Sequence, residues 1–162
     1  MAFLGMAECN AKGDVNVSKF KDRIAGCGGF INITQNTHKV VFCGTFTAKG
    51  LREEIRDGKL VITHEGAVQK FIDKVGQITF SAEYAHKHNP QVMFITERCV
   101  FVLTDKGLVL TEIAPGVDLQ KDILDQMEFV PHVAEDLKTM DERLFRDEPM
   151  GLAQDIFEQQ AG

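Results

Sequence analysis

The chain has 162 residues, of which 44% are hydrophobic and 26% charged, and its formal net charge is −6. This length predicts one domain, residues 1–162, with a sizeable core, and residues 147–162 as a tail that can fray. The negative charge argues against non-specific binding to nucleic acid or to an anionic membrane, although a single lysine can still hold a phosphate. Without a run of 18 apolar residues or a charged-then-apolar leader, neither a membrane span nor a secretory signal is predicted.

The four cysteines form no C-x-x-C pair. Cys9, Cys43 and Cys99 lie in apolar runs, and we expect them to be buried, reduced thiols of a cytoplasmic protein. Cys27 lies instead in a glycine-rich segment. For Cys27 to be the nucleophile of a small hydrolase, the fold would have to bring a distant histidine to it. A bystander role is the simpler expectation.

Apolar patterning predicts a chain whose middle is rich in strands. The first two strands, residues 2–7 and 14–18, flank a turn at residues 10–13, and the first has the uncharged, apolar sequence of a buried strand. The clearest hairpin signal is Asp57-Gly58. The other predicted strands are residues 40–46, 51–55, 59–63, 68–80, 92–95, 100–103, 108–113 and 129–133.

Helices are predicted mainly toward the end of the chain. Residues 81–85 fit one or two helical turns, and Asp118 is a good N-cap for a helix over the residues that follow. Residues 137–145 and 150–157 have the pattern of acidic, solvated helices. Composition alone therefore indicates an α+β protein.

Three glycines within four residues stand out in segment 25–30 (AGCGGF). Glycines let a backbone turn sharply and approach a bound group closely. If Gly29 begins a helix, the first N–H groups there are unpaired and suit an oxygen that carries negative charge. A plain tight turn is the alternative, and the β-branched Ile31 and Ile33 favour a strand rather than a helix over residues 30–36. The spacing is not the dinucleotide fingerprint, which needs a further glycine.

Six segments, including this cluster and others on both sides of it, resemble segments of one protein family and occur in the same order. They are residues 2–7 (AFLGMA), 13–18 (GDVNVS), 26–33 (GCGGFINI), 47–50 (TAKG), 95–98 (ITER) and 110–116 (LTEIAPG). Together they resemble class I coenzyme A transferases of the acetate/propionate and 3-ketoacid types. The resemblance extends over about residues 2–146.

The resemblance implies an open α/β sheet with helices, namely the C-terminal part of the β half of the CoA-transferase (NagB-like) module. Residues outside the chain would complete it, so an exposed sheet edge is expected. The family moves coenzyme A from an acyl-CoA to a free carboxylic acid through a glutamyl-CoA intermediate, in short-chain fatty acid and ketone body metabolism, with no further cofactor. The implied partners are both substrates, the remaining CoA-transferase segments and further copies in a homo-oligomer.

The same resemblance assigns roles to individual residues. The main-chain N–H groups of Gly28 and Gly29 would stabilise the oxyanion, and no metal is implied. Coenzyme A would contact Gly26, Gly29, Phe30 and Lys49, although a lysine at this position is otherwise a solvated loop residue. The attacking glutamate lies upstream of the glycine cluster in the family, in a segment that this chain lacks. The chain alone is therefore expected to be inactive.

Three carboxylates could replace that glutamate, because Glu8, Glu97 and Glu112 border apolar strands where burial would raise a pKa. A structural ion pair is the simpler expectation for Glu97 and Arg98. His86 and His88 would share a face only in a strand, so no metal site is expected there. The alternative functions are a non-catalytic module that binds coenzyme A, acyl-CoA or a partner protein, and the Cys27 hydrolase.

Overall fold

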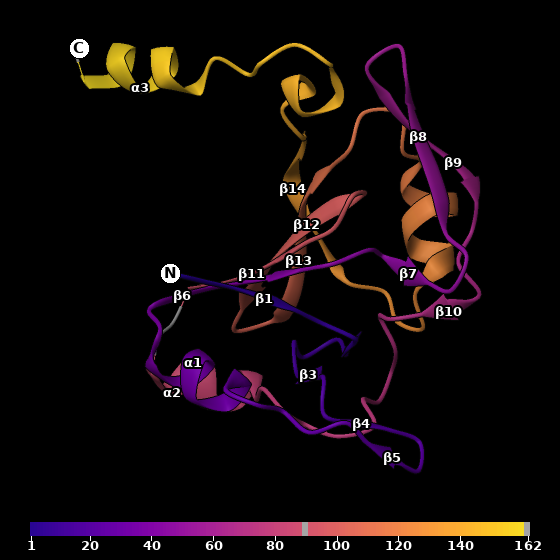
Figure 1. Cartoon of the computed structure of the whole chain (residues 1–162), viewed down its shortest axis with the longest axis vertical. Helices are drawn as coiled ribbons and strands as arrows, with labels where there is room; N and C mark the ends of the chain where they lie inside the picture. Colours follow the sequence, from indigo (N-terminus) through magenta and orange to yellow (C-terminus); the bar gives the residue numbers. More distant parts are fainter. Residues whose placement is uncertain (89–90, 161–162) are drawn as a thin grey trace.

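The protein is built around one six-stranded sheet (Figure 1), as seen in a computed structural model that describes residues 1–88 and 91–160. Its strand order is β1-β6-β11-β12-β13-β14. β1, β6 and β11 are mutually parallel, the pairs β11–β12 and β12–β13 are antiparallel, and β14 runs parallel to β13. The strands are β1 (Ala2–Gly5), β6 (Lys39–Cys43), β11 (Gln91–Ile95), β12 (Cys99–Thr104), β13 (Gly107–Ile113) and β14 (His132–Thr139).

Two short helices pack on one face of this sheet. α1 (Phe30–Asn36) leads into β6, and α2 (Ala82–His88) precedes β11. The rings of Phe30 and Phe42 stack with their centroids 5.7 Å apart, and Phe80 meets Phe42 edge-on at 5.0 Å. Figure 1 shows both helices on the same side of the sheet. Phe30, Phe42 and Phe80 all belong to the hydrophobic core.

Small two-stranded units lie outside the main sheet, and most of them emerge where β1 and β6 end. They are β2 (Glu8–Cys9) with β3 (Val15–Asn16), β4 (Lys19–Phe20) with β5 (Arg23–Ile24), β7 (Thr47–Ala48) with β10 (Val68–Gln69), and β8 (Arg52–Arg56) with β9 (Lys59–His64). The β8–β9 hairpin turns at Asp57 and Gly58, whose φ values of 51° and 72° confirm the predicted turn. Of residues 68–80, expected to be one extended stretch, only Val68–Gln69 forms a named strand.

The C-terminal third contains short helical elements. Asp118 caps a π-helical turn (Leu119–Ile123) by accepting a hydrogen bond from Lys121 N at 2.7 Å, and one 3-10 turn follows at Leu124–Gln126. Another 3-10 turn (Glu142–Phe145) leads to helix α3 (Leu152–Gln160), within the predicted tail. None of the described helices is long and apolar enough to cross a membrane.

Helix α1 confirms that Gly29 is an N-cap and overrides the strand preference of its isoleucines. Phe30 and Thr34, one turn apart, are both buried against the sheet, whereas Ile31 and Ile33 face outward. Burial of one helical stripe therefore outweighs local β propensity.

Two further sequence predictions were wrong. Residues 137–145 are not one helix, because β14 extends to Thr139 and pairs with β13, and only Glu142–Phe145 forms a 3-10 turn. The pairing register shifts between Leu110 and Glu112, so the half-buried residues of β14, Ala134 and Leu137, recur at a spacing of three that resembles a helix. β1 is not buried either: it is an edge strand, and Phe3 is 66% exposed.

Candidate functional site

The glycine-rich segment forms an exposed loop that enters α1. Gly26 and Gly28 have φ values of 79° and 50°, a region that favours glycine. The start of the loop is anchored, since Ala25 N and Gly26 N donate to Ser18 O at 2.8 and 3.1 Å. Its end is anchored by Phe30, whose N–H donates to Cys27 O at 3.0 Å and whose ring is buried in the core.

Between these anchors lie the main-chain N–H groups of Cys27, Gly28 and Gly29. Within residues 1–88 and 91–160, neither Gly28 N nor Gly29 N donates a hydrogen bond to another residue. Both glycines are exposed, and a Cβ built on Gly28 would meet no atom within 4 Å. The loop can therefore offer main-chain N–H groups to a ligand oxygen. A ligand contact by Phe30 is restricted to its main chain.

The loop and Lys49 belong to the same edge of the sheet. α1 is the crossover between the parallel neighbours β1 and β6, so its N-terminus lies on the side where these strands end (Figure 1). Lys49 follows β7 beyond the end of β6, is exposed, and has a φ of 61°. Open α/β sheets bind ligands at the carboxyl ends of their strands.

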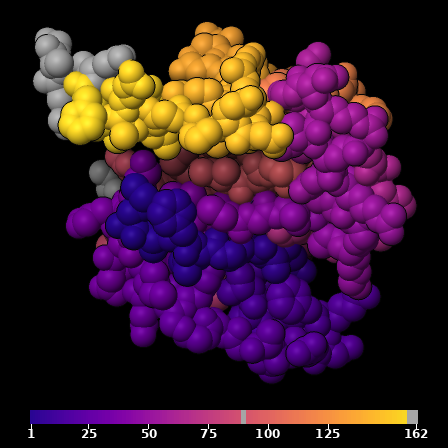
Figure 2. Space-filling model, turned by 45° about the horizontal axis from the view of Figure 1, so that its top comes forward, coloured from indigo at the N-terminus to yellow at the C-terminus, as the bar shows by residue number. Residues whose placement is uncertain are grey.

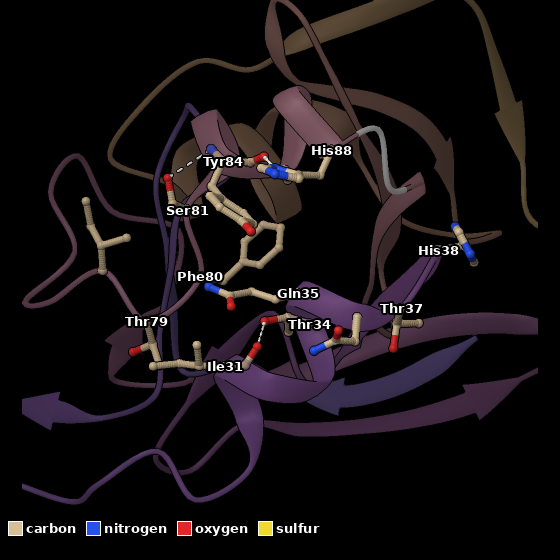
Figure 3. A pocket seen from close by; sticks show the side chains of 13 residues that line it. Ile31, Thr34, Gln35, Thr37, His38, Thr79, Phe80, Ser81, Tyr84 and His88 are labelled. Carbon is tan, nitrogen blue, oxygen red and sulfur yellow. Dashed lines mark hydrogen bonds between the residues drawn. The ribbon is translucent and has the colours of Figure 1, made fainter.

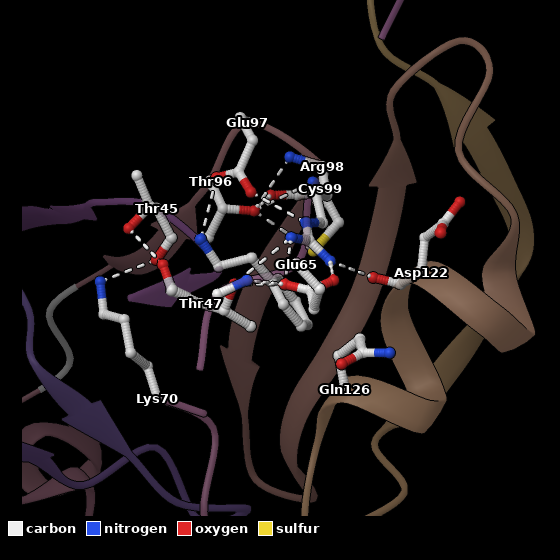
Figure 4. Close-up of polar contacts among 12 residues, drawn as sticks. Thr45, Thr47, Glu65, Lys70, Thr96, Glu97, Arg98, Cys99, Asp122 and Gln126 are labelled. Carbon is white, nitrogen blue, oxygen red and sulfur yellow. Dashed lines mark hydrogen bonds and ion pairs between the residues drawn. The ribbon is translucent and has the colours of Figure 1, made fainter. Parts of the chain in front are cut away.

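A buried arginine organises the other loops at this edge (Figure 4). The Arg98 side chain is fully buried, and its Nε donates to Glu97 Oε1 at 2.9 Å. Its two terminal nitrogens donate to both oxygens of Glu65 at 2.7 and 2.8 Å, and Nη1 also donates to Asp122 O at 2.8 Å. The guanidinium lies 5.1 Å from the ring centroid of Phe46.

The arginine's partners are themselves tied to the loop after β6. Glu97 Oε2 accepts from Phe46 N at 2.9 Å, and the Thr47 hydroxyl donates to Glu65. The structural ion pair expected for Glu97 and Arg98 is confirmed. This network fixes the segments that follow β6, β9 and β11 relative to one another.

Because of Glu65, the free energy of unfolding should depend on pH in the acid range. Burial raises its pKa, but hydrogen bonds from Arg98, Thr47 and Gly66 N together outweigh burial and lower it below the ordinary value. A lowered pKa means that the stabilisation is fully present above the unfolded pKa of about 4.3 and is lost as the pH falls through the folded pKa. In urea unfolding, the advantage of the wild type over Glu65→Gln should be constant above about pH 5 and shrink below it. A constant difference down to pH 3 would contradict this.

Gly66 should not tolerate a side chain. A Cβ there would lie 2.5 Å from Thr47 Oγ1 and 2.6 Å from Ala48 O. Because one of these atoms is backbone, Gly66→Ala should lower the free energy of unfolding by about 1–3 kcal/mol. Gly5→Ala is the control, since no atom lies within 4 Å of that Cβ. Equal stability of the two variants would refute the clash.

Sequence reasoning missed Lys70, which is only 7% exposed and donates from Nζ to Thr45 O at 2.7 Å. Burial lowers its pKa, against the opposing effect of Glu97. A Cβ on Gly44 would lie 2.8 Å from this ammonium, so the glycine leaves room for it. The available signal was a lysine directly before the apolar pair Phe71-Ile72.

The remaining candidates are not gathered around the glycine loop. Glu8 Oε2 accepts from Asn16 Nδ2 at 2.7 Å and from Gly76 N at 2.8 Å, and Glu112 lies opposite Lys138 in the sheet. His88 Nδ1 lies 2.9 Å from Tyr84 O in α2. No group of three or more metal-binding side chains occurs in the part of the chain that the structure describes.

The cysteines are free thiols. Cys9 and Cys99 are buried as predicted, and burial raises the pKa of both. Cys43 is only half-buried. Cys27 is also half-buried and packs against the core, and no described side chain forms a hydrogen bond with its sulfur.

A cavity of about 560 Å³ lies between α1 and α2 (Figure 3). Its lining includes Gln35, His38, Phe80, Tyr84 and His88. It extends along α1 from Ile31 to His38, just before β6, and none of the residues predicted to bind the oxyanion or coenzyme A lines it. Topology therefore favours the carboxyl edge as the functional site over this cavity.

Known CoA-transferases match nearly the whole chain, although no protein-family model matches it. Acetate CoA-transferase YdiF of Escherichia coli K12 is 53% identical over 151 residues, which are 93% of this chain and 28% of that protein. Caffeate CoA-transferase of Acetobacterium woodii is 51% identical over 157 residues, covering 94% of this chain and 30% of that protein.

Solved structures agree with these matches. The acyl-CoA transferase YdiF of Escherichia coli O157:H7, both as apoenzyme and as a thioester complex with CoA, superposes with a TM-score of 0.90 at 54% identity. The overlap covers 92% of this chain and 29% of that one. The chain thus spans less than a third of the length of these relatives. It is homologous to CoA-transferases over more than nine tenths of its own residues and corresponds to a C-terminal fraction of them.

Proposed function

We propose that this chain supplies part of the active site of a CoA-transferase that moves coenzyme A from an acyl-CoA to a free carboxylic acid. The nucleophilic glutamate comes from the remaining CoA-transferase polypeptide. The two together are called the assembled enzyme below. The observation that carries the proposal is the exposed loop with unengaged N–H groups at Gly28 and Gly29, in a chain homologous to enzymes of this name.

The chemistry gives this loop a defined task. A glutamate carboxylate attacks the thioester carbonyl, and the carbonyl oxygen takes on negative charge before coenzyme A leaves as a thiolate. The thiolate then attacks the resulting anhydride, releasing the acid and forming a glutamyl-CoA thioester. Each addition passes through an oxyanion that fixed N–H donors stabilise. In this proposal the donors are Gly28 N and Gly29 N, which precede the first turn of α1.

Coenzyme A would lie along the same edge of the sheet. Its contacts in this proposal are the backbone of Gly26, Gly29 and Phe30 and the ammonium of Lys49, which is exposed beyond the end of β6. Four free thiols fit a reducing cytoplasm. The enzyme would act on short-chain acids, including those of ketone body metabolism, as a homo-oligomer.

Reconstitution tests the proposal. The chain is mixed with a polypeptide that contains the part of E. coli YdiF outside the matched region, and transfer from acetyl-CoA to propionate is measured. Turnover is expected only in the mixture. Mass spectrometry of the chain alone with acetyl-CoA should show no covalent adduct. An adduct on Glu8, Glu97 or Glu112 would overturn the assignment of the nucleophile to another segment.

A non-catalytic binding module is the second candidate, favoured by one observation. Glu8 and Glu97 both already accept hydrogen bonds within the fold, so neither is free to attack. In that case coenzyme A would bind the isolated chain in calorimetry, while the reconstituted mixture would show no turnover.

A further inference from the structure

The segment that follows β6 is associated with two features that cost stability. Segment 44–50 (GTFTAKG) leaves the sheet at the carboxyl end of β6 and leads to the β8–β9 hairpin. In Figure 2 the magenta part of the chain, which contains this hairpin, forms one flank of the molecule. The first costly feature is the positive φ of Lys49, and the second is the buried ammonium of Lys70, which donates to Thr45 O.

Lys49 is held in a strained conformation. Its φ of 61° lies in the left-handed region, which is unfavourable for any side chain with a Cβ. Contacts on either side impose this conformation: Ala48 pairs with Val68 across β7 and β10, and Lys49 O accepts from Ala67 N at 3.0 Å. An exposed residue that its surroundings hold under strain points to function rather than to stability.

Lys70 is buried without a carboxylate partner. It and Arg98 are the two buried basic residues within residues 1–88 and 91–160, and only Arg98 forms ion pairs. The Lys70 ammonium has three N–H groups, and its partner in this part of the chain is one main-chain oxygen, Thr45 O at 2.7 Å. Such burial costs free energy and lowers the pKa of the lysine. A methionine would fill most of the same space without a charge.

The fold fixes both ends of the Lys70 side chain. At the backbone, Lys70 O accepts from Cys9 N at 2.8 Å, and the next residue, Phe71, is fully buried. At the other end, Gly44 leaves the space that the ammonium occupies, since a Cβ there would lie 2.8 Å from Nζ. Figure 4 shows the side chain extended toward Thr45. The glycine, the lysine and the carbonyl therefore form one matched contact.

Thr45 depends on Lys70 for its link to another element. Within the described ranges, Thr45 O accepts from Lys70, and the Thr45 hydroxyl donates to Thr47 O inside the same segment. The next residue, Phe46, is held separately, because its N–H donates to a carboxylate of the arginine network. Releasing the Thr45 peptide group would therefore loosen the start of the path that leads from β6 to Lys49.

We propose that Lys70 is a positioning residue of the coenzyme A site. Its ammonium fixes Thr45 O and thereby sets the direction in which the chain carries Lys49 to the ligand. Lys70 does not itself touch coenzyme A. The inference rests on the proposed function, in which Lys49 makes that contact. It accounts for both costly features together, because the strained residue presents the contact and the buried ammonium holds the segment that carries it.

A double-variant cycle in the assembled enzyme tests this role. Lys49→Met and Lys70→Met should each raise the KM for acetyl-CoA, by up to about tenfold. Because Lys70 acts through Lys49, the double variant should be no worse than Lys49→Met alone. In Lys70→Met, kcat and the KM for propionate should stay within about twofold of wild type, since only binding of the acyl-CoA is weakened.

Two measurements on the chain alone separate positioning from a purely structural role. Lys70→Met should unfold in urea at a midpoint no lower than that of the wild type, because it removes a buried charge that has no ion-pair partner. Exchange of the backbone amides of residues 45–50 should nevertheless become about tenfold faster. Lys74→Met is the matched control, since Lys74 is exposed four residues further along. It should change neither the exchange nor the KM.

Gly44→Ala disturbs the same contact from the other side. Its methyl group would displace the flexible end of Lys70 rather than backbone, so the chain should still fold. It should raise the KM for acetyl-CoA and speed exchange in residues 45–50 as Lys70→Met does. Combined with Lys70→Met it should add nothing, because methionine ends short of the ammonium position. Gly5→Ala is the control, since no atom lies within 4 Å of that Cβ.

Three results would overturn the inference. Additive effects of Lys49→Met and Lys70→Met would mean that Lys70 acts independently of Lys49. Wild-type KM and exchange in both Lys70→Met and Gly44→Ala would mean that the contact positions nothing. A lower urea midpoint in Lys70→Met with unchanged exchange in residues 45–50 would leave the lysine a structural role only. The exchange measurement requires no turnover, so faster exchange beside an inactive mixture would sink the proposed function and keep the control of Lys49 by Lys70.

Discussion

Gly29→Val is expected to lower kcat of the assembled enzyme by about 10²–10³ while leaving the fold intact. Gly29 has an ordinary φ of −84°, and a Cβ there would lie 3.6 Å from Ile33 Cδ1, which is normal contact. The substitution is therefore not strained. Its added methyl groups instead occupy the space beside the two free N–H groups, where the thioester oxygen would lie.

The measurement is steady-state transfer of coenzyme A, combined with urea unfolding of the chain. Gln35→Val is the matched control, since it adds a β-branched residue at an exposed position near the other end of α1. It should retain wild-type turnover. Wild-type kcat in Gly29→Val would remove the oxyanion role from this loop. A large loss of stability without a kinetic effect would leave the loop with a structural role only.

Arg98→Ala is expected to lower the free energy of unfolding by about 3–5 kcal/mol. The arginine is fully buried and holds Glu65 and Glu97, so its removal leaves two partly buried carboxylates without their cation. The substitution also removes the hydrogen bond that Arg98 donates to Asp122 O and the contact of its guanidinium with the Phe46 ring. The energetic cost comes chiefly from these stranded groups rather than from the net value of the ion pair.

Denaturant unfolding at pH 7 measures this loss. Arg56→Ala is the control, because its pair with Glu54 is exposed on both sides and should be worth at most about 1 kcal/mol. The double variant Arg98→Met with Glu65→Gln should recover part of the stability, since it removes two of the charges together. A loss in Arg98→Ala no larger than in Arg56→Ala would show that the network contributes little to the fold.

At this edge of the sheet, Gly29→Val should affect the reaction and Arg98→Ala should affect the stability of the fold. The glycine loop presents donors, is anchored at its ends by Ser18 and Phe30, and packs Cys27 against the core. The Arg98 network holds the loops after β6, β9 and β11, including the segment that leads to Lys49. A variant in the network should therefore lower the free energy of unfolding. It should weaken coenzyme A binding only indirectly, by shifting the segment that leads to Lys49.

The sequence by itself determined the elements whose signals are local. Asp57-Gly58 specified a hairpin because both residues adopt positive φ readily, and Asp118 specified a helical start through its side-chain cap. The glycine cluster indicated a loop that could present main-chain donors. The order of six short segments indicated the CoA-transferase family, and the homology confirmed it.

Only the tertiary structure decided the features that depend on distant residues. Helix α1 forms despite Ile31 and Ile33 because the sheet buries Phe30 and Thr34, and residues 137–139 extend a strand because β13 offers a pairing edge. Arg98 meets Glu65 across 33 positions of sequence, and Lys70 reaches Thr45 across 25. No local pattern encodes such contacts, because burial and pairing are properties of the assembled sheet rather than of any one segment.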